Sequence, residues 1–288
     1  MALEDPQTAD LQTADRQSIA SRDAFQARYG ETAPEGLLWN DTIAHLLAHR
    51  SVRAYRTDPL PEGTVPTLIA AAQSAASSSN LQLWSVVAIS DAAQREKLAE
   101  LAGGQAHIRT APLILLWVAD LARGHLIAAD AGEPVEGFAY LESWTVAAVD
   151  AALAAQNAAL AAESLGLGTV YIGALRNKPE EVAAIAGLPP HAAVVFGLVV
   201  GWEDESRPAA IKPRLPQSAI LHEGRYQLEE QRPAIKAYDE TARAFQRSQG
   251  QDAVGWIAQI LNRSRSAASL NGRHRLREVL HGLGFPLK

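Results

Sequence analysis

The sequence predicts a fold that mixes helices and strands in layers, of the α/β or α+β class. Four short apolar runs rich in β-branched residues have the length and composition of buried strands. Helical segments separate these runs, and such alternation indicates a sheet covered by helices. The pattern leaves the strand order open. The expected strands are residues 84–89 (WSVVAI), 113–118 (LILLWV), 169–172 and 193–200.

The helices before and between the strands are predicted from capping residues and helix breakers. Each expected start has a short polar side chain or a proline that can satisfy or replace the first free N–H groups. The expected starts are Asp41, Pro61, Asp91 and the pair Asn177 and Pro179, with Gly187 ending the last helix.

Residues 143–165 predict one long helix, which is apolar on nearly every face and rich in alanine. A helix with apolar residues all round is expected to be buried all round. Its small side chains also allow another helix to approach closely. The pattern therefore fits a central core helix and a dimer-interface helix equally well, with Gly166 as the stop.

The two ends of the chain differ in charge. Residues 1–40 carry a net charge of −4 and are expected to be an acidic extension, with one amphipathic helix over residues 16–29 that docks through Ile19, Phe25 and Tyr29. Residues 41–288 are expected to form the main domain, ending in a basic helical tail from about residue 231. Residues 243–288 carry a net charge of +6.

Composition excludes several classes of protein. The formal charge of −6 gives no general attraction to nucleic acid or to an anionic membrane, so neither is an expected partner. The absence of cysteine removes disulfides, thiolate metal sites and thiol nucleophiles, so any redox chemistry needs a bound cofactor. The first ten residues, MALEDPQTAD, do not resemble a signal peptide, and we expect a cytoplasmic protein.

Several common catalytic motifs are absent from the sequence. No G-x-S-x-G, H-E-x-x-H or phosphate-binding G-x-x-x-x-G-K-[ST] motif occurs. Only His45 and His49 have helical ligand spacing, and no acidic residue completes a site, so no metal is expected. The glycines Gly166 and Gly168 follow a helix and precede a strand, which is the reverse of a dinucleotide-binding turn.

Three polar clusters remain as candidates for ligand binding. The segment HRSVRAYR over residues 49–56 places two arginines around a hydroxyl, and KPR over residues 212–214 supplies two more cations. Such groups can bind a phosphate or the electron-rich edge of a planar cofactor. The segment SSSN over residues 77–80 can donate several hydrogen bonds. Each cluster alone fits an ordinary solvated loop equally well.

Taken in order, six segments resemble the nitroreductase family, most closely its oxygen-insensitive NADPH nitroreductase and flavin reductase branch. The resemblance covers about residues 41–288. The segments are HRSVRAYR (49–56), SSSN (77–80), GGQ (103–105), AAQNAALAAESLGLGTVYIGALRN (154–177), FGLVVGW (196–202) and KPRLP (212–216).

The resemblance implies an α+β homodimer with an antiparallel-rich sheet flanked by helices, a long central helix in the subunit interface and one FMN per subunit. It assigns FMN contacts by position, with the serine loop reaching the FMN of the other subunit. The implied cofactor-binding residues are His49, Arg50, Ser51, Arg53, Ser77, Ser78, Ser79, Gln105, Tyr171, Ile172, Gly173, Ala174, Lys212 and Arg214.

The implied reaction is two-electron, ping-pong reduction of nitroaromatics, quinones or flavins by NADPH or, less favoured, NADH. The cofactor performs the chemistry, so no side chain is assigned as catalytic. Arg176 and Arg273 resemble positions that line the substrate mouth. Ala174 departs from the family, which usually has glycine there, so either its backbone is conventional or the loop has shifted.

Two features leave the donor and the function open. The family's arginine-bearing nucleotide loop is replaced here by GQDAVGW over residues 250–256, where Arg263 or Arg265 could substitute for it. The basic tail favours NADPH, because it suits the extra 2'-phosphate. The alternative function is a flavin-binding sensory or storage protein with little or no reductase activity.

Overall fold

The computed structural model of the chain describes residues 19–288 and divides them into two compact units. The first unit comprises residues 19–50 and 210–265 of the described chain, and the second comprises Ser51–Ala209 with Ser266–Lys288. We describe each unit by itself. The domain boundary expected near residue 40 stays a prediction.

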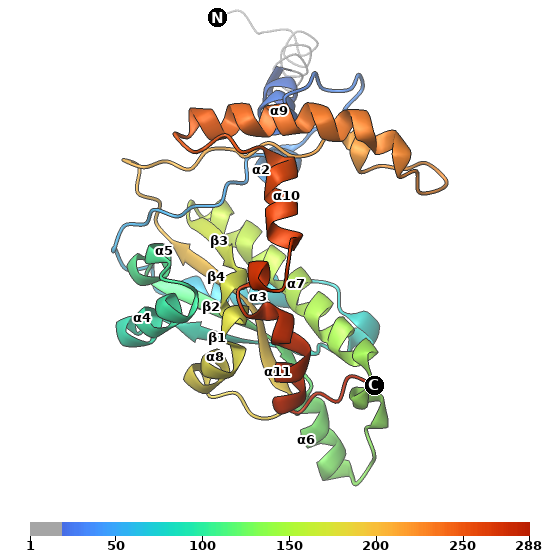
Figure 1. Ribbon diagram of the computed structural model, residues 1–288. Helices are drawn as coiled ribbons and strands as arrows, with labels where there is room; N and C mark the ends of the chain where they lie inside the picture. The colour runs from blue at the N-terminus through green and yellow to red at the C-terminus, as the bar shows by residue number, and fades with distance from the viewer. Residues whose placement is uncertain (1–18) are drawn as a thin grey trace, which may run out of the picture. The chain divides into compact units, whose positions relative to one another are not determined.

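The second unit is built on a four-stranded sheet (Figure 1). Its strands are β1 (Trp84–Ile89), β2 (Leu113–Asp120), β3 (Gly168–Ile172) and β4 (Ala192–Gly201), in the order β1-β2-β4-β3. Every pair is antiparallel. The four expected strands are confirmed, and the antiparallel pairing makes the fold α+β, as the family resemblance implied.

Alternate residues of the sheet face two different helical layers. Leu113, Leu115 and Trp117 pack with α3 (Thr64–Gln73) and α7 (Leu141–Ser164), whereas Ile114 and Leu116 pack with α4, α5 and α8. Because successive strand residues point to opposite faces, a strand buried on both faces needs an uninterrupted apolar run. The run LILLWV satisfies that requirement. The second layer is α4 (Ala92–Leu101), α5 (Ala106–Thr110) and α8 (Pro179–Ala186).

Helix α7 buries one face and exposes another within the chain. The buried face is almost entirely alanine, which lets the helix lie close to the sheet. The opposite face keeps Val149 and Leu153 at 51% and 44% exposure, so burial all round is not achieved inside one chain. By length and composition alone α7 could cross a membrane, a test that core helices also pass.

A third cluster closes the end of the second unit. Leu280 and Phe285 pack there with Ala147 of α7 and with Leu121, which precedes α6 (Ala122–Ala131). Leu280 belongs to α11 (Leu276–Gly282). The C-terminal segment is therefore an integral part of this core rather than an appendage to it.

The first unit is helical. It contains a helix over residues 19–29, α2 (Asp41–Leu47), α9 (Arg232–Ser248) and α10 (Trp256–Ser264). Phe25 is buried and stacks on the half-buried Tyr29, as expected for a docked helix, whereas Ile19 is 59% exposed. Residues 16–18 of the expected helix lie outside the described residues.

Helix ends follow the sequence signals in part. Asp91 caps α4 by accepting from the Gln94 backbone N–H at 2.8 Å, as expected, and Gly187 ends α8 in the left-handed conformation. The start of α2 was assigned wrongly, because Asn40 rather than Asp41 provides the cap. The second helix starts at Thr64, three residues after Pro61. Lys178 rather than Asn177 occupies the cap of α8, without a side-chain bond.

One close approach places the candidate site on the sheet. The segment after Arg50 runs beside β3, where Ser51 forms a parallel bridge with Thr169 and the Val52 N–H donates to the Thr169 carbonyl at 2.9 Å. A Cβ at Gly168 would lie 2.7 Å from a Val52 methyl. Only glycine therefore permits this distance without a shift of the backbone.

We expect Gly168→Ala to lower the free energy of unfolding by about 1–3 kcal/mol, because the added methyl overpacks this contact. Gly137→Ala is the control, since a Cβ at Gly137 has nothing within 4 Å. Urea unfolding of the two variants measures the difference. Equal stability of both variants would show that the β3 contact does not require glycine.

Candidate active site

The segment that pairs with β3, residues 51–55, contains both buried and exposed side chains. Val52 and Tyr55 are buried, and the Tyr55 hydroxyl donates to the Val52 carbonyl at 2.8 Å. Arg53, between them, is exposed and donates to the Ser51 carbonyl at 3.4 Å. The buried pair anchors the segment in the core, so that the Arg53 side chain is directed outward.

Four expected site residues lie at the end of β3 and at the start of the short helical turn that follows it. Ile172 and Ala174 are buried, while Tyr171 is 36% exposed. Gly173 and Ala174 begin the 3-10 helix η3 (Gly173–Asn177), and neither residue has a positive φ. The backbone at Ala174 is therefore conventional, which explains why alanine is tolerated there.

The GGQ segment lies at the start of α5. Gly103 and Gly104 have φ values of +85° and +80°, which favour glycine, and Gln105 occupies the N-cap position of α5. The Gln105 side chain donates to the Ala102 carbonyl at 3.0 Å. This turn reverses the chain between α4 and α5 and presents Gln105 at its end.

One hydrophobic cluster brings these three segments together. It contains Val52 from the first segment, Ile172 and Ala174 from the second, and Ala102 and Ile108 from either side of GGQ. The polar residues next to these anchors therefore surround one part of the second unit. These polar residues are Ser51, Arg53, Gln105 and Tyr171, each within three residues along the chain of a member of the cluster.

His107 is a residue of this region that sequence reasoning missed. Its Nε2 atom is buried and has no hydrogen-bond partner within the described chain. Burial, and to a smaller extent the charge of Arg53, lowers the pKa of His107. Burial also raises the pKa of Tyr55, which Arg53 opposes. Arg53 therefore acts electrostatically on both rings, and at His107 burial and the charge of Arg53 both favour the neutral imidazole.

A cation beside a buried, unpartnered imidazole suits a ligand with a polar edge. A buried polar atom without a partner is costly unless a ligand or water satisfies it. The pyrimidine edge of a flavin, which forms hydrogen bonds and becomes anionic on reduction, would meet both needs. The residues present in the second unit thus fit FMN.

The serine loop is held by a carboxylate on α7. Asp150 is 1% exposed and accepts from the Ser77 hydroxyl at 2.6 Å and from the Ser78 N–H at 3.1 Å. The Ser77 hydroxyl in turn accepts from the Gln82 N–H at 2.8 Å. Ser77 is thus committed to the fold, whereas Ser78 and Ser79 are exposed, with Ser79 left-handed at φ +49°.

The two expected substrate residues, Arg176 and Arg273, lie on segments that are joined by a hydrogen bond. The Arg273 side chain donates to the Asn177 side chain at 2.8 Å, and Asn177 follows Arg176 directly. Arg176 donates to the carbonyl of Val195, the extra residue of a β-bulge in β4. A β-bulge leaves a backbone group without its hydrogen bond to the neighbouring strand. Here the Arg176 side chain supplies that hydrogen bond. Arg176 is therefore partly structural.

The first unit holds the remaining four expected residues. Lys212 and Arg214 are exposed, and Arg214 lines a hollow of about 560 Å³ with Tyr29 and Leu215. The backbone carbonyls of His49 and Lys212 both accept from the buried Arg28. The structure thus brings the backbones of the expected segments 49–50 and 212–214 together within this unit.

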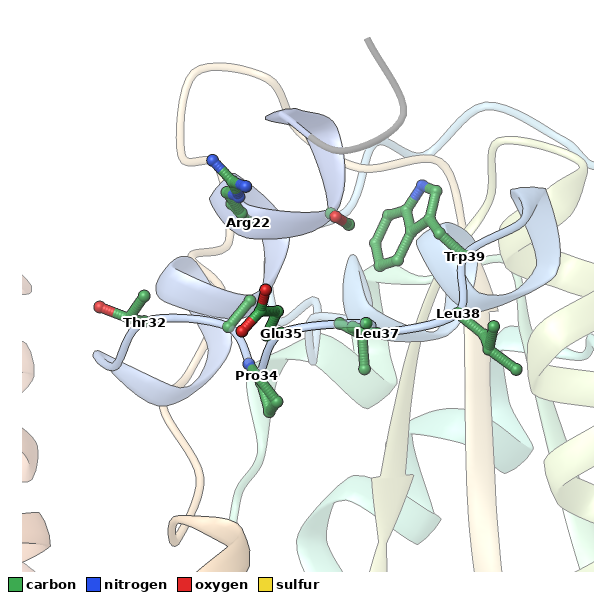
Figure 2. A pocket seen from close by; sticks show the side chains of 10 residues that line it. Arg22, Thr32, Pro34, Glu35, Leu37, Leu38 and Trp39 are labelled. Atoms are coloured by element: carbon green, nitrogen blue, oxygen red, sulfur yellow. The ribbon is translucent and has the colours of Figure 1, made fainter. Parts of the chain in front are cut away.

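A further hollow of about 530 Å³ lies in the N-terminal segment of the first unit. Figure 2 shows Arg22, Glu35 and Trp39 among the residues that line it. None of the expected site residues lines this hollow. It therefore adds nothing to the candidate site.

The second unit thus has an α+β fold with an antiparallel sheet, and its candidate cofactor residues include Arg53 and the buried His107. The chain belongs to the nitroreductase family: residues 46–202 match the nitroreductase family and residues 212–288 match the nitroreductase family C-terminal domain. This membership confirms the resemblance that the six sequence segments indicated.

Three characterised relatives have similar sequences. The chain is 38% identical to the NADPH-flavin oxidoreductase of Vibrio harveyi over 77% of this chain and 90% of the relative. It is 38% identical to the FMN reductase [NAD(P)H] of Bacillus subtilis, over 86% and 99%. It is also 38% identical to the oxygen-insensitive NADPH nitroreductase of Salmonella typhimurium, over 73% and 84%.

A solved structure supports the fold. The hypothetical oxidoreductase YcnD from Bacillus subtilis superposes with a TM-score of 0.82 at 37% identity, covering 87% of this chain and all of that one. The fold class inferred from antiparallel pairing is thus shared by a protein of known structure.

The residues that sequence reasoning missed differ in how clearly the sequence indicates them. Asp150 is a charged residue inside an apolar helix, which indicates a buried partner. His107 follows GGQ by two residues, so proximity to a recognised segment could have indicated it. Arg28 gave no sequence signal, because its partners are distant along the chain.

We expect Ser77→Ala to lower the free energy of unfolding by about 1.5–3 kcal/mol, because it removes a hydrogen bond to a buried carboxylate. Ser85→Ala is the control, since Ser85 donates to Asp120 at the same 2.6 Å, and its hydroxyl also accepts from the exposed Arg123 side chain at 2.7 Å. Asp120 keeps its bonds from the Arg123 side chain and backbone in this variant. Ser85→Ala should therefore lower the free energy of unfolding by only about 0.5–1.5 kcal/mol. A larger cost in urea unfolding for Ser85→Ala would contradict the role assigned to Asp150.

Proposed function

We propose that this protein is an FMN-dependent NAD(P)H oxidoreductase that reduces nitroaromatics, quinones or flavins by a ping-pong, two-electron mechanism. The observation that carries the proposal is the convergence of the 51–53, GGQ and 171–174 segments on one cluster, where Arg53 acts on a buried, unpartnered His107. The names of the relatives, which include FMN reductase and NADPH nitroreductase, support the same activity.

FMN, when bound, would supply the two-electron hydride chemistry between the nicotinamide donor and the acceptor. The chain's own residues bind and orient the reactants. Arg53 supplies positive charge, which favours an anionic pyrimidine edge. His107 offers a hydrogen-bonding nitrogen that is already desolvated. The backbone of residues 171–174, held by buried Ile172 and Ala174, provides a fixed wall for the ring.

The phosphate and ribityl contacts are assigned to His49, Arg50, Ser51, Lys212 and Arg214. Four of these residues carry basic side chains, and arginine and lysine suit a phosphate dianion. Their assignment rests on the family pattern and on the hydrogen bonds that join the 49 and 212 backbones in the first unit.

NADPH is the proposed preferred donor, with NADH as the less favoured one. Two of the relatives carry NADPH in their names. The replaced loop is anchored within the first unit, where the Gly255 N–H donates to Gln246 at 2.9 Å and the Arg243 side chain donates to the Ala253 carbonyl at 2.8 Å. Such anchoring leaves Arg263 and Arg265, at the end of α10, as candidates for the 2'-phosphate.

The activity test combines cofactor content with steady-state kinetics. Purified protein should be yellow with about one FMN per chain, and NADPH oxidation should need both FMN and an acceptor. Varying donor and acceptor should give parallel double-reciprocal lines, the pattern of a ping-pong reaction. A protein that takes up FMN but is not bleached by NADPH would support a storage or sensory role instead. Failure to bind FMN would refute both.

We further propose that the protein acts as a homodimer in the cytoplasm on small-molecule acceptors. The exposed apolar face of α7, with Leu141, Val149 and Leu153, supports a subunit interface, because exposed apolar patches favour association. The serine loop is bonded to the same helix through Asp150, which would couple dimer formation to flavin binding.

We expect Leu153→Glu to give a monomer with reduced FMN content, because a carboxylate would be buried in the interface. Leu126→Glu is the control: Leu126 is 62% exposed on α6, outside α7. Sedimentation velocity with absorbance at the flavin band measures both properties. A flavin-loaded Leu153→Glu dimer would count against α7 as the interface.

Arg214 and Arg273 are assigned to different ligands and should fail differently. Arg214→Ala removes a charge-assisted contact of about 1.5–3 kcal/mol and should weaken FMN affinity by roughly 10- to 150-fold. Arg273→Ala should keep the flavin and lower kcat/KM, through a raised KM if the contact is equally strong in ground and transition states. Flavin occupancy and kinetics distinguish them. The reverse pattern would show that the two assignments are exchanged.

A further inference from the structure

A buried arginine in the N-terminal segment is bonded to both segments that carry the expected phosphate-binding residues. Arg28 is 4% exposed. Its guanidinium donates to the Leu47 carbonyl at 2.7 Å, to the Lys212 carbonyl at 2.8 Å and to the His49 carbonyl. All four residues belong to the first unit. One side chain thus joins backbone groups of two separate segments, and Lys212 lies 184 residues from Arg28 along the sequence.

The backbone of Arg28 adds a second connection to the same segment. The Arg214 N–H donates to the Arg28 carbonyl at 2.9 Å. On its other side, the Pro213 carbonyl accepts from the Tyr238 hydroxyl of α9 at 2.9 Å. The residues from Lys212 to Arg214 are therefore held at three consecutive positions.

The first segment needs such a donor because it follows a helix end. α2 ends at Leu47, and the last carbonyls of a helix have no partner inside the helix. Arginine can satisfy them, and its planar fork can address several acceptors from one position. A lysine in the same place would offer a point charge without the fork. The geometry observed at Arg28 uses the fork.

The helix over residues 19–29 keeps Arg28 in place through its neighbours. Phe25 and Ser21 are 4% and 6% exposed, so one face of this helix is packed. Arg28 lies outside both ranges that match the family, residues 46–202 and 212–288. The N-terminal segment therefore adds a contact to the expected site from outside the family's shared part.

We propose that Arg28 is a positioning residue for the phosphate end of FMN, an inference that rests on the proposed function. By binding the backbone at His49 and at Lys212, it sets the spacing of the cationic side chains that emerge from these two segments. A preorganised set of cations binds a phosphate more tightly than one that must be ordered on binding. Arg28 itself is buried and acts through its neighbours.

The test compares two flavins that differ only in the phosphate. The full-length Arg28→Met variant loses the guanidinium and keeps an apolar stem, and Arg28→Lys keeps the charge and loses the fork. For both, the Kd of FMN should rise at least about tenfold, while the Kd of riboflavin stays within about twofold of the wild-type value. Arg22→Met, on the exposed side of the same helix, should change neither constant.

The outcomes separate this inference from the proposed function. An equal rise for FMN and riboflavin, or an unchanged Kd for FMN, would overturn the positioning role while leaving FMN binding intact. Full recovery in Arg28→Lys would also overturn it, because charge alone would then suffice. A wild-type protein that binds no FMN would overturn the proposed function, and this inference with it. Thermal unfolding of each apoprotein identifies any variant that fails to fold.

Discussion

The contact between Val52 and Gly168 is the constraint on which the candidate site in the second unit depends. It allows a segment outside the four-stranded sheet to lie against β3 at hydrogen-bonding distance. With Val52 and Ala54 buried on either side of it, the alternation of the extended chain directs Arg53 outward. The positions of Arg53 and of the residues that follow β3 are therefore linked through one close packing contact.

Buried polar side chains perform the finer positioning in both units. Asp150 holds the serine loop of the second unit, and Arg28 holds two segments of the first. In each case a charged group is almost fully buried, and each satisfies backbone or hydroxyl groups that regular secondary structure leaves free. Burial of a charge is costly unless it is hydrogen-bonded, so such groups specify one geometry for the loops that they bind.

Helix α7 combines two demands that conflict within one chain. Its alanine face allows close packing on the sheet, and its outward face keeps valine and leucine exposed. The exposed apolar face of such a helix is stabilised in water when another surface buries it. The same helix carries Asp150, so one element both packs on the sheet and holds the serine loop.

The sequence by itself determined the four strands, the long helix and the caps at Asp91 and Gly187, because these depend on local burial and on short-range hydrogen bonds. It also indicated the expected site segments through their resemblance to a family. The strand order, the bulge at Val195 and the roles of Arg28, Asp150 and His107 were decided only by the tertiary structure. Each of these depends on groups far apart along the chain, such as Ser77 and Asp150 at a separation of 73 residues, and no local pattern encodes which distant groups will meet.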